Sequence, residues 1–273
     1  MGFRIQNNIE ALNAQRNLNV SSMGMSKSLQ RLSSGYRINS AADDAAGLAI
    51  SQQFRADIAS YKVAKQNVSE ANALLQVAEG GMDQIGNILT RLKELATQAA
   101  SANAGGNLGK IDAEATTLIE EMDRIANSTK YANATLLDGT FGTATFQVGT
   151  SNNANDQIAI TLGTVSSTAL GLGSFSLALV SDAQAGLDTL NTAISTLSDT
   201  RGAVGAAQNR LGYANANLSI TIENYTAAES TIRDVDMASE MTTFTKNQIL
   251  VQAGTAMLAQ ANVASQQVLS LFK

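Results

Sequence analysis

A heptad pattern in the second half of the chain constrains the fold more than any other feature of the sequence. Between Leu187 and Ile232, steps of three and four residues alternate, and one of the two seam positions (d) is apolar throughout. The other seam position (a) is polar in three consecutive heptads, at Arg201, Gln208 and Asn215. This spacing is typical of a long coiled-coil helix, in which polar seam residues fix register at a cost in stability. The d positions are Leu190, Leu197, Val204, Leu211, Leu218, Tyr225 and Ile232.

An earlier apolar stripe supplies a partner for this helix. The stripe predicts a helix from about Ala45 to Ala100, and the heptad seam predicts another from about Asp182 to Ile232. At a rise of about 1.5 Å per residue these helices would be roughly 75 to 85 Å long. A shorter helix, from about Lys110 to Thr129, can fold back along the first. The stripe consists of Leu75, Ala78, Met82, Ile85, Leu89, Leu92, Ala96 and Ala99.

The composition excludes most catalytic chemistry. The 273 residues include no Pro, Cys, His or Trp, and aromatic residues make up only 4%. The chain therefore lacks an imidazole base, a thiolate nucleophile, a disulfide and a zinc site of the usual kind. The densest carboxylates, Glu120, Glu121 and Asp123 and the pair Asp234 and Asp236, are explained by helix faces and caps. We therefore expect no enzyme, no metal site and no cofactor.

Charge and hydropathy narrow the choice of partners. A net charge of −5 does not offer the basic surface that nucleic acid requires. The uncharged stretch from Asn247 to Phe272 is interrupted throughout by Gln and Asn, so we expect no membrane insertion. We expect no secretory signal, because the first residues do not form a basic and apolar leader, and export from the cell would then need another route.

Turn signals divide the remainder of the chain. Gly35 is placed to end a first helix, and Asp43 and Asp44 are placed to begin the next. From Asp138 the pattern changes to alternation, which predicts a β-hairpin with a turn-rich tip. The segment from Thr164 to Ser176 is rich in Gly, Ser and Thr, and we expect an exposed loop or a short second hairpin that tolerates insertion. The alternating apolar residues are Ala144, Phe146 and Val148, then Ile158, Ile160 and Leu162.

The two end segments, residues 1–42 and 234–273, carry few large apolar side chains between Asn, Gln, Ser and Ala. Alone they bury too little surface to offset the entropy of ordering, so we expect them to become helical only when neighbouring subunits cover them. The stripe on the C-terminal segment would otherwise be exposed and prone to aggregation. It consists of Leu250, Ala253, Met257, Ala261, Ala264, Val268 and Leu271.

Three strings, in this order and spacing, resemble bacterial flagellin. They are LSSGYRINSAADDAAGLAI at 32–50, LTRLKELATQAA at 89–100 and ILVQAGTAMLAQANVASQQVLSLF at 249–272. The similarity covers nearly the whole chain except about residues 141–180, and the chain resembles a short form without the large outer domains. It departs from the family at Ser265, where flagellins commonly carry Pro, and at Tyr36, where an aliphatic residue is usual.

The resemblance implies a mainly α fold, a long antiparallel coiled-coil-like bundle of paired N- and C-terminal segments with a small β-hairpin region near the middle. Residues 1–44 and 234–273 would form an inner, terminal domain that makes an inner tube. Residues 45–233 would form an outer rod of long helices, including the hairpin and loop region 138–180. The breaks near Gly35 and Arg233 would then meet at the joint between the two domains.

The resemblance also implies a function and partners. The protein would be a structural subunit that is exported unfolded by the flagellar type III route and polymerises at the tip of an extracellular filament used for swimming. Its partners would be identical subunits, the flagellar cap protein, the hook-filament junction protein and an export chaperone that covers the C-terminal stripe. Arg91, Leu95 and Glu114 match the patch recognised by the vertebrate Toll-like receptor for flagellin. Arg91 and Leu95 are four residues apart on one helix face.

Two alternatives stay open at this point. A hook-filament junction protein, or another secreted or signalling coiled-coil protein, would share the periodicity but would not need matched ends rich in Gln, Asn and Ala. An organelle protein with a cleaved N-terminal arm would explain the basic residues between Arg4 and Arg37, but it would leave the C-terminal string unexplained.

Overall fold

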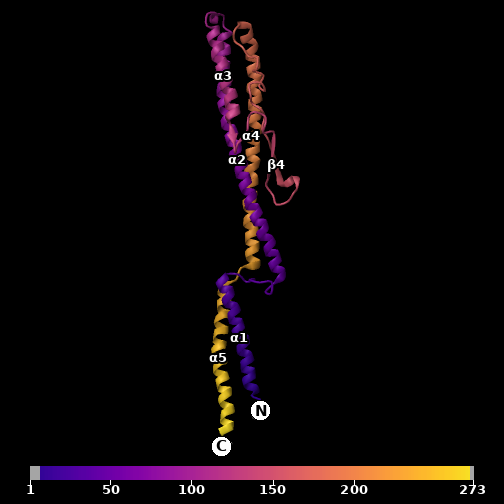
Figure 1. Ribbon diagram of the computed structural model, residues 1–273, viewed down its shortest axis with the longest axis vertical. Coiled ribbons are helices and arrows are strands. Elements are labelled where there is room, and N and C mark those ends of the chain that lie inside the picture. Colours follow the sequence, from indigo (N-terminus) through magenta and orange to yellow (C-terminus); the bar gives the residue numbers. More distant parts are fainter. Residues whose placement is uncertain (1–6, 271–273) are drawn as a thin grey trace. The chain divides into compact units, whose positions relative to one another are not determined.

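The computed structural model describes residues 7–270, apart from the side chains of residues 104 and 264–270. The fold is mainly α (Figure 1), and the predicted central helices are confirmed to within about two residues at each end. The helices are α1 (Ile9–Ser34), α2 (Ala45–Ala99), α3 (Leu108–Ser128), α4 (Val180–Arg233) and α5 (Met237–Ser270). The strands are β1 (Lys130–Tyr131), β2 (Ala134–Thr135), β3 (Thr143–Gln147) and β4 (Gln157–Thr161).

The chain divides into two compact units. The terminal unit consists of Met1–Ala56 and Asn224–Lys273, and the central unit consists of Asp57–Glu223. Helices α2 and α4 each contribute to both units, so this division falls inside the two long helices. The inner and outer domains expected from the sequence, with limits at the breaks between helices, stay a prediction.

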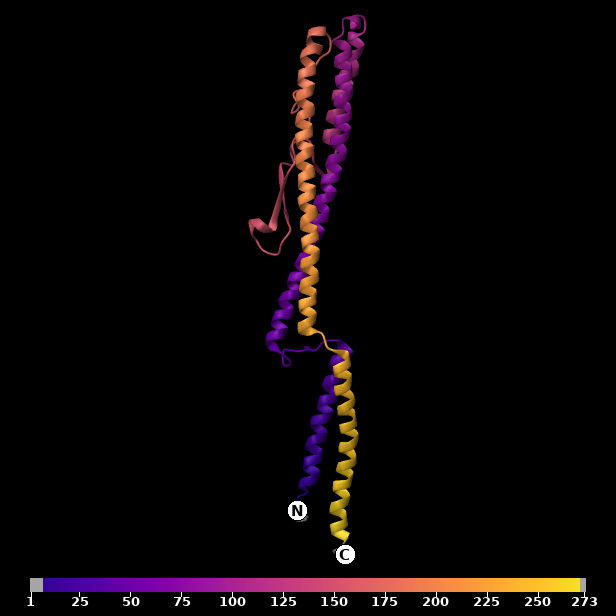
Figure 2. The same cartoon turned by 180° about the vertical axis from the view of Figure 1, so that it is seen from behind.

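In the terminal unit, α1 and α5 lie side by side in Figures 1 and 2. They are antiparallel, because Asn8 near the start of α1 donates to the Ala261 carbonyl at 2.9 Å, while Arg31 near its end meets Glu240 at 3.4 Å. The two end segments are thus partners of each other within one chain. This differs from the expectation that neighbouring subunits must first cover them, because small residues such as Gly24 and Gly254 let the two helices approach closely, which the apolar pattern does not reveal.

The chain breaks between helices meet in the terminal unit, as predicted. Gly35 ends α1 in the left-handed conformation at φ 76°, which glycine adopts without a steric penalty. Tyr36 pairs with Asp234 in an isolated antiparallel bridge. The Arg37 amide donates to the Arg233 carbonyl at 2.7 Å. These contacts join the α1–α2 connection to the α4–α5 connection.

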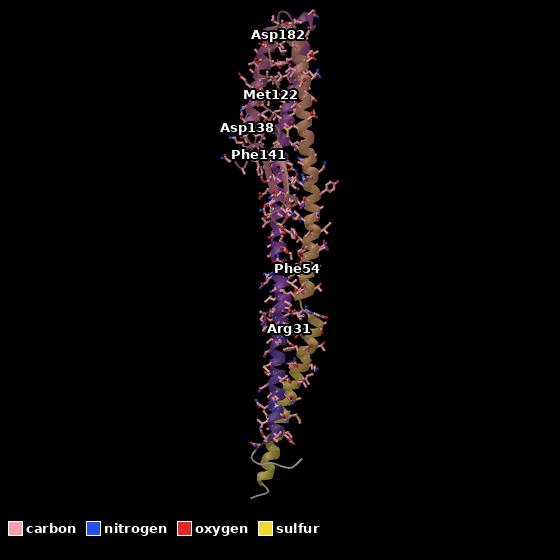
Figure 3. The ribbon with its side chains drawn as sticks, turned by 90° about the vertical axis from the view of Figure 1, so that its right-hand side faces the viewer. Arg31, Phe54, Met122, Asp138, Phe141 and Asp182 are labelled. Carbon is pink, nitrogen blue, oxygen red and sulfur yellow. The ribbon has the colours of Figure 1, made fainter. Side chains whose placement is uncertain are left out.

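The core of the central unit lies where α2, α3 and α4 pack together. The stripe of α2 and the first five d positions of α4, from Leu190 to Leu218, face one another, and Met122 of α3, labelled in Figure 3, is fully buried among them. The cluster continues into the strands and the segment that follows. Its fully buried side chains include Leu75, Met82, Ile85, Leu89, Leu92, Met122, Leu136, Leu137, Ile160, Leu172 and Leu177.

The predicted hairpin is confirmed. Strands β3 and β4 are antiparallel, with Thr143 opposite Thr161 and Gln147 opposite Gln157. Figure 2 shows this hairpin beside α4. A second, shorter pair, β1 and β2, was not predicted, and it is closed by a turn with positive φ at Ala132 and Asn133. The apolar residues Ile158, Ile160 and Leu162 turn toward the core.

The segment from Thr164 to Ser176 is neither an exposed loop nor a second hairpin, so that prediction is wrong. The amide and hydroxyl of Ser167 donate to the Asp123 carboxylate of α3 at 2.8 and 2.6 Å. Apolar side chains spaced among the small polar residues complete the core of the central unit. They are Val165, Leu170 and Leu172, each at most 4% exposed.

Candidate functional site

The acidic residues of α3 make structural contacts. Arg124 donates two hydrogen bonds, of 2.6 and 2.7 Å, to Glu121 and so lowers the pKa of that carboxyl. Asp112 accepts from the hydroxyl of Ser176 and from the Leu177 amide. Within residues 7–270 no group of three or more acidic, His or Cys side chains is arranged to hold a metal ion. The carboxylates of α3 therefore pair along the helix and anchor the segment before α4.

Helix α1 leaves large apolar side chains in solvent outside its contact with α5. Most of the surface of each one is accessible, with exposed fractions between 53% and 66%. Isolated exposed apolar residues are ordinary, but several along one helix mark a surface that another molecule covers. These residues are Ile9, Leu12, Val20, Met23 and Leu29.

Helix α5 is exposed along more than one face. Of the predicted stripe, Leu250, Ala253 and Met257 are exposed, whereas Ala261 is half-buried at the contact with α1. The side chains of Ala264 and Val268, and all of Leu271, lie outside the described residues. Further large apolar residues of α5 are exposed that do not belong to the stripe predicted from the sequence. They are Met237, Met241, Ile249 and Val263.

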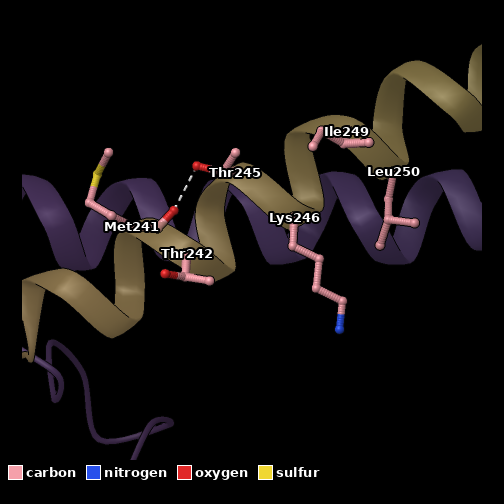
Figure 4. Close-up of a pocket in the computed structure, with 6 residues that line it drawn as sticks. All are labelled: Met241, Thr242, Thr245, Lys246, Ile249 and Leu250. Carbon is pink, nitrogen blue, oxygen red and sulfur yellow. Dashed lines mark hydrogen bonds between the residues drawn. The ribbon is translucent and has the colours of Figure 1, made fainter.

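Two grooves run along this apolar surface. One, of about 630 Å³, has Leu250, Ala253 and Met257 of α5 on one side and residues of α1 on the other, Glu10 and Asn13 among them. The second, of about 560 Å³, lies wholly on α5 and is drawn in Figure 4. Leu250 lines both, so the two grooves adjoin at this residue. The second groove is lined by Met241, Thr242, Thr245, Lys246, Ile249 and Leu250.

Helix α5 has no separate apolar and polar faces, because exposed polar residues such as Thr242, Gln248 and Gln252 lie between its exposed apolar residues. In the groove of Figure 4, Lys246 carries the charge, while the Thr245 hydroxyl is turned back to the Met241 carbonyl at 2.8 Å. A helix whose large apolar residues are not confined to one face can contact other helices on more than one side. Among the described residues, no helix has the length and apolar character that a membrane span requires. In the sequence, the apolar residues that flank the predicted stripe were the signal for the groove drawn in Figure 4.

A network of charges holds the connection between α1 and α2. The Lys27 ammonium lies 2.7 Å from Asp43 and holds the pKa of that carboxyl well below its ordinary value. Asp43 also accepts from the amides of Asn39 and Ser40, and both bonds favour its charged form. Elsewhere in this unit Arg233 stacks on the Tyr36 ring at 3.9 Å, an arrangement that stabilises the cation.

The three polar seam positions of α4 have different environments. Arg201 pairs with Asp83 of α2 at 3.2 Å, and Gln208 donates to Glu79 of α2 at 3.0 Å. The Asn215 side-chain oxygen is buried and has no hydrogen-bond partner. The sequence marks these positions as a set, but the structure distinguishes two paired layers from one unpaired layer.

The structure brings two residues of the predicted receptor patch together but not the third. Arg91 donates to Glu114 of α3 at 3.0 and 2.7 Å and to Glu94 at 3.0 Å, and these carboxylates raise the pKa of the guanidinium. Leu95 is only 2% exposed, because α3 and α4 both pack on α2 here and widen its apolar arc. The expectation that Leu95 shares an exposed face with Arg91 is therefore wrong.

Long paired helices and apolar surfaces at both ends of the chain describe a structural protein. The family model for the bacterial flagellin N-terminal helical region matches residues 5–142, and that for the C-terminal helical region matches residues 187–272. The chain belongs to the bacterial flagellin family.

Similar proteins agree with this assignment. A flagellin of Bacillus subtilis is 41% identical over 99% of this chain and 100% of its own length. A flagellin of Halalkalibacterium halodurans is 40% identical over 98% of this chain and 99% of its own length. The crystal structure of Bacillus cereus flagellin matches 56% of this chain and 88% of its own, at 28% identity and a TM-score of 0.51.

Membership of this family decides between the readings left open by the sequence. A flagellin is a structural subunit of the flagellar filament, which is built from identical subunits, and it is not an enzyme. The alternative of a junction or signalling coiled-coil protein is not favoured.

Proposed function

We propose that the exposed apolar faces of α1 and α5 hold neighbouring subunits of the filament together. The observation that carries this proposal is the concentration of large exposed apolar residues on these two helices, five on α1 and six on α5. Covering such side chains contributes about 25 cal/mol per Å² of apolar surface removed from water. Repeated over many subunits, this is sufficient to drive association.

In this proposal residues 1–44 and 234–273 form the inner tube of the filament, and residues 45–233 form the outer rod. The exposure of large apolar residues on more than one side of α5 supports a place where other helices contact it on several sides. The grooves along Leu250 are of the kind that receive the side chains of a neighbouring helix.

Salt-induced polymerisation of the purified chain, viewed by negative-stain microscopy, tests the proposal. We expect long filaments from the parent and none from a chain lacking Gln248–Lys273, whose central helices should still give a cooperative thermal transition. A double Leu250→Gln and Met257→Gln variant should assemble poorly, whereas Leu179→Gln, at an exposed site outside α1 and α5, should assemble as the parent does. Ordinary filaments from the truncated chain would contradict the proposal.

The exposed apolar stripe of α5 must be shielded from solvent before assembly. We infer that an export chaperone binds this C-terminal stripe in the cytoplasm. The chain then leaves unfolded through the flagellar type III channel and is added at the tip of an extracellular filament, beneath the cap protein. The junction protein would contact the first subunits. Isothermal titration of the full chain against the chaperone should show binding, and the chain lacking Gln248–Lys273 should show none. Equal binding by both chains would exclude the stripe as the chaperone site.

For the vertebrate receptor, the proposal is restricted to Arg91 and Glu114, since Leu95 is buried. Both polar residues are exposed and lie on neighbouring helices. An Arg91→Ala variant should activate the receptor less than the parent in a reporter assay. Lys93→Ala, at an exposed position nearby, serves as the control.

A further inference from the structure

The methionines are unevenly distributed between the two units. Met82 and Met122, in the central unit, are fully buried. Among the residues that the structure describes, every exposed methionine lies on α1 or α5. These are Met23 at 66% exposure, Met257 at 63%, and Met237 and Met241 at 49% each.

The composition makes these thioethers the preferred targets of an oxidant. The chain contains no Cys, so no thiolate competes for peroxide, and it contains no Trp or His. Exposure governs which methionine sulfur a small oxidant in solution can reach. The four exposed methionines of the terminal unit are thus the most accessible ones, Met25 of α1 is half-buried, and Met82 and Met122 are shielded by the core.

We propose that Met23, Met237, Met241 and Met257 are oxidation sites of the free subunit, and that their oxidation by a peroxide blocks assembly. The inference rests on the proposed role of α1 and α5 as assembly surfaces. In the reaction the sulfur lone pair attacks one peroxide oxygen, the O–O bond breaks, a sulfur–oxygen bond forms and water leaves. The sulfur is oxidised by two electrons, and hydrogen peroxide is reduced.

The positions of two of these methionines explain why the product would block assembly. Met257 lies beside Leu250 and Ala253 in one groove, and Met241 lies with Ile249 in the other, which Figure 4 shows. A sulfoxide is polar and a strong hydrogen-bond acceptor, and burying it among aliphatic side chains leaves it without a donor. Once subunits have assembled, the same side chains are covered and protected. Oxidation therefore acts on the free subunit and spares the filament.

Peroxide treatment of the unpolymerised full chain, followed by peptide mass mapping and a polymerisation assay, tests the inference. We expect the four exposed methionines to be oxidised about tenfold or more faster than Met82 and Met122. The oxidised subunits should polymerise more slowly, and methionine sulfoxide reductase should restore the rate. Preformed filaments should be oxidised more slowly at these positions. Equal oxidation of the buried and exposed methionines, or normal polymerisation of oxidised subunits, would overturn the inference.

A variant with all four exposed methionines replaced by Leu is the matched control, since it keeps the apolar surface but removes the four exposed sulfur atoms. It should polymerise after peroxide treatment as it does before, and sensitivity equal to that of the parent would overturn the inference. If the variant does not assemble, the reductase rescue of the parent decides the question alone. Failure of the untreated parent to polymerise would count against the proposed function, and the mass mapping would still test site selectivity.

Discussion

At the scale of single residues, Gln208 and Asn215 occupy equivalent positions one heptad apart in α4, but their side chains differ in hydrogen bonding. Gln208 is bonded to Glu79, whereas the buried oxygen of Asn215 has no partner. A buried polar atom without a partner costs roughly 1 to 3 kcal/mol. Asn215 also borders a cavity of about 150 Å³ between α2 and α4, which a larger apolar side chain could fill.

We therefore predict that Asn215→Leu raises the free energy of unfolding by about 1 kcal/mol, since it removes an unpaired acceptor. Gln208→Leu should leave it unchanged or lower it, because Glu79 then loses its donor. Thermal melting followed by circular dichroism measures both. A destabilised Asn215→Leu, or equal gains from both variants, would show that the pairing of these atoms does not determine the stability of the seam.

Asp43 gives the connection after α1 a dependence on pH. Its pKa is lowered chiefly by Lys27, so the folded chain holds this proton less tightly than the unfolded chain does. The stabilisation is therefore complete above the ordinary pKa of 3.8 and is lost progressively as the pH falls below it. Since Lys27 is half exposed, we expect only about 1 kcal/mol.

Asp43→Asn keeps an oxygen for the amides of Asn39 and Ser40 but removes the charge. The variant should unfold at lower denaturant concentration than the parent at neutral pH, and the difference should shrink at about pH 2.5. A deficit of the same size at both pH values would mean that the charge of Asp43 is not the cause.

At the scale of elements, two adjacent glycines of α2 differ in what surrounds them. A Cβ at Gly80 would meet no atom within 4 Å, whereas one at Gly81 would lie 2.7 Å from the Thr129 hydroxyl and 2.8 Å from Leu137. Thr129 is held by its bond to the Ile125 carbonyl, and Leu137 is fully buried, so neither can move freely. The chain that follows α3 therefore packs closely on α2 at Gly81.

Replacing a helical glycine by alanine stabilises a helix by roughly 0.5 to 1 kcal/mol when space is available. Gly80→Ala should show this gain in the melting temperature, while Gly81→Ala should show none or a loss. The two variants share the helix and the intrinsic preference, so each controls for the other. Equal stabilisation by both would contradict the close packing of α2 at Gly81.

The long helices and the hairpin could be predicted because their apolar residues recur with a fixed period. The segment from Thr164 to Ser176 could not, since Val165, Leu170 and Leu172 follow neither period and are buried by contacts with distant elements. Leu95 was misassigned for a related reason. The sequence shows that Leu95 is apolar, but not that two helices pack on α2 at that point.

Of the candidate site, the sequence predicted the part on α5 but not the part on α1. The stripe of α5 through Leu250 and Met257 stands out because it is apolar and regular, and both residues are exposed as expected. The surface of α1 was missed, since Val20 and Met23 are separated by small polar residues that weaken any pattern. Which apolar side chains remain in solvent depends on how α1 and α5 pair, and that follows only from the structure.

At the scale of the whole molecule, the two ends of the chain depend on one another. The bond from Asn8 to Ala261 joins residues 253 positions apart, so the terminal unit can form only after the complete chain is available. Closing so long a loop is entropically costly, and a chain that folds only once it is complete agrees with the export in an unfolded state proposed above. The surface that completes folding of the ends is adjacent to the one proposed for assembly.

The most direct test of this account is the burial of Leu250 and Met257 in the assembled filament, measured by helical reconstruction at side-chain resolution. In the single chain these side chains are 43% and 63% exposed. The account predicts that in the filament both are buried against helices of neighbouring subunits. An intact filament in which both side chains still face solvent would contradict the claim that the apolar faces of α1 and α5 hold the subunits together.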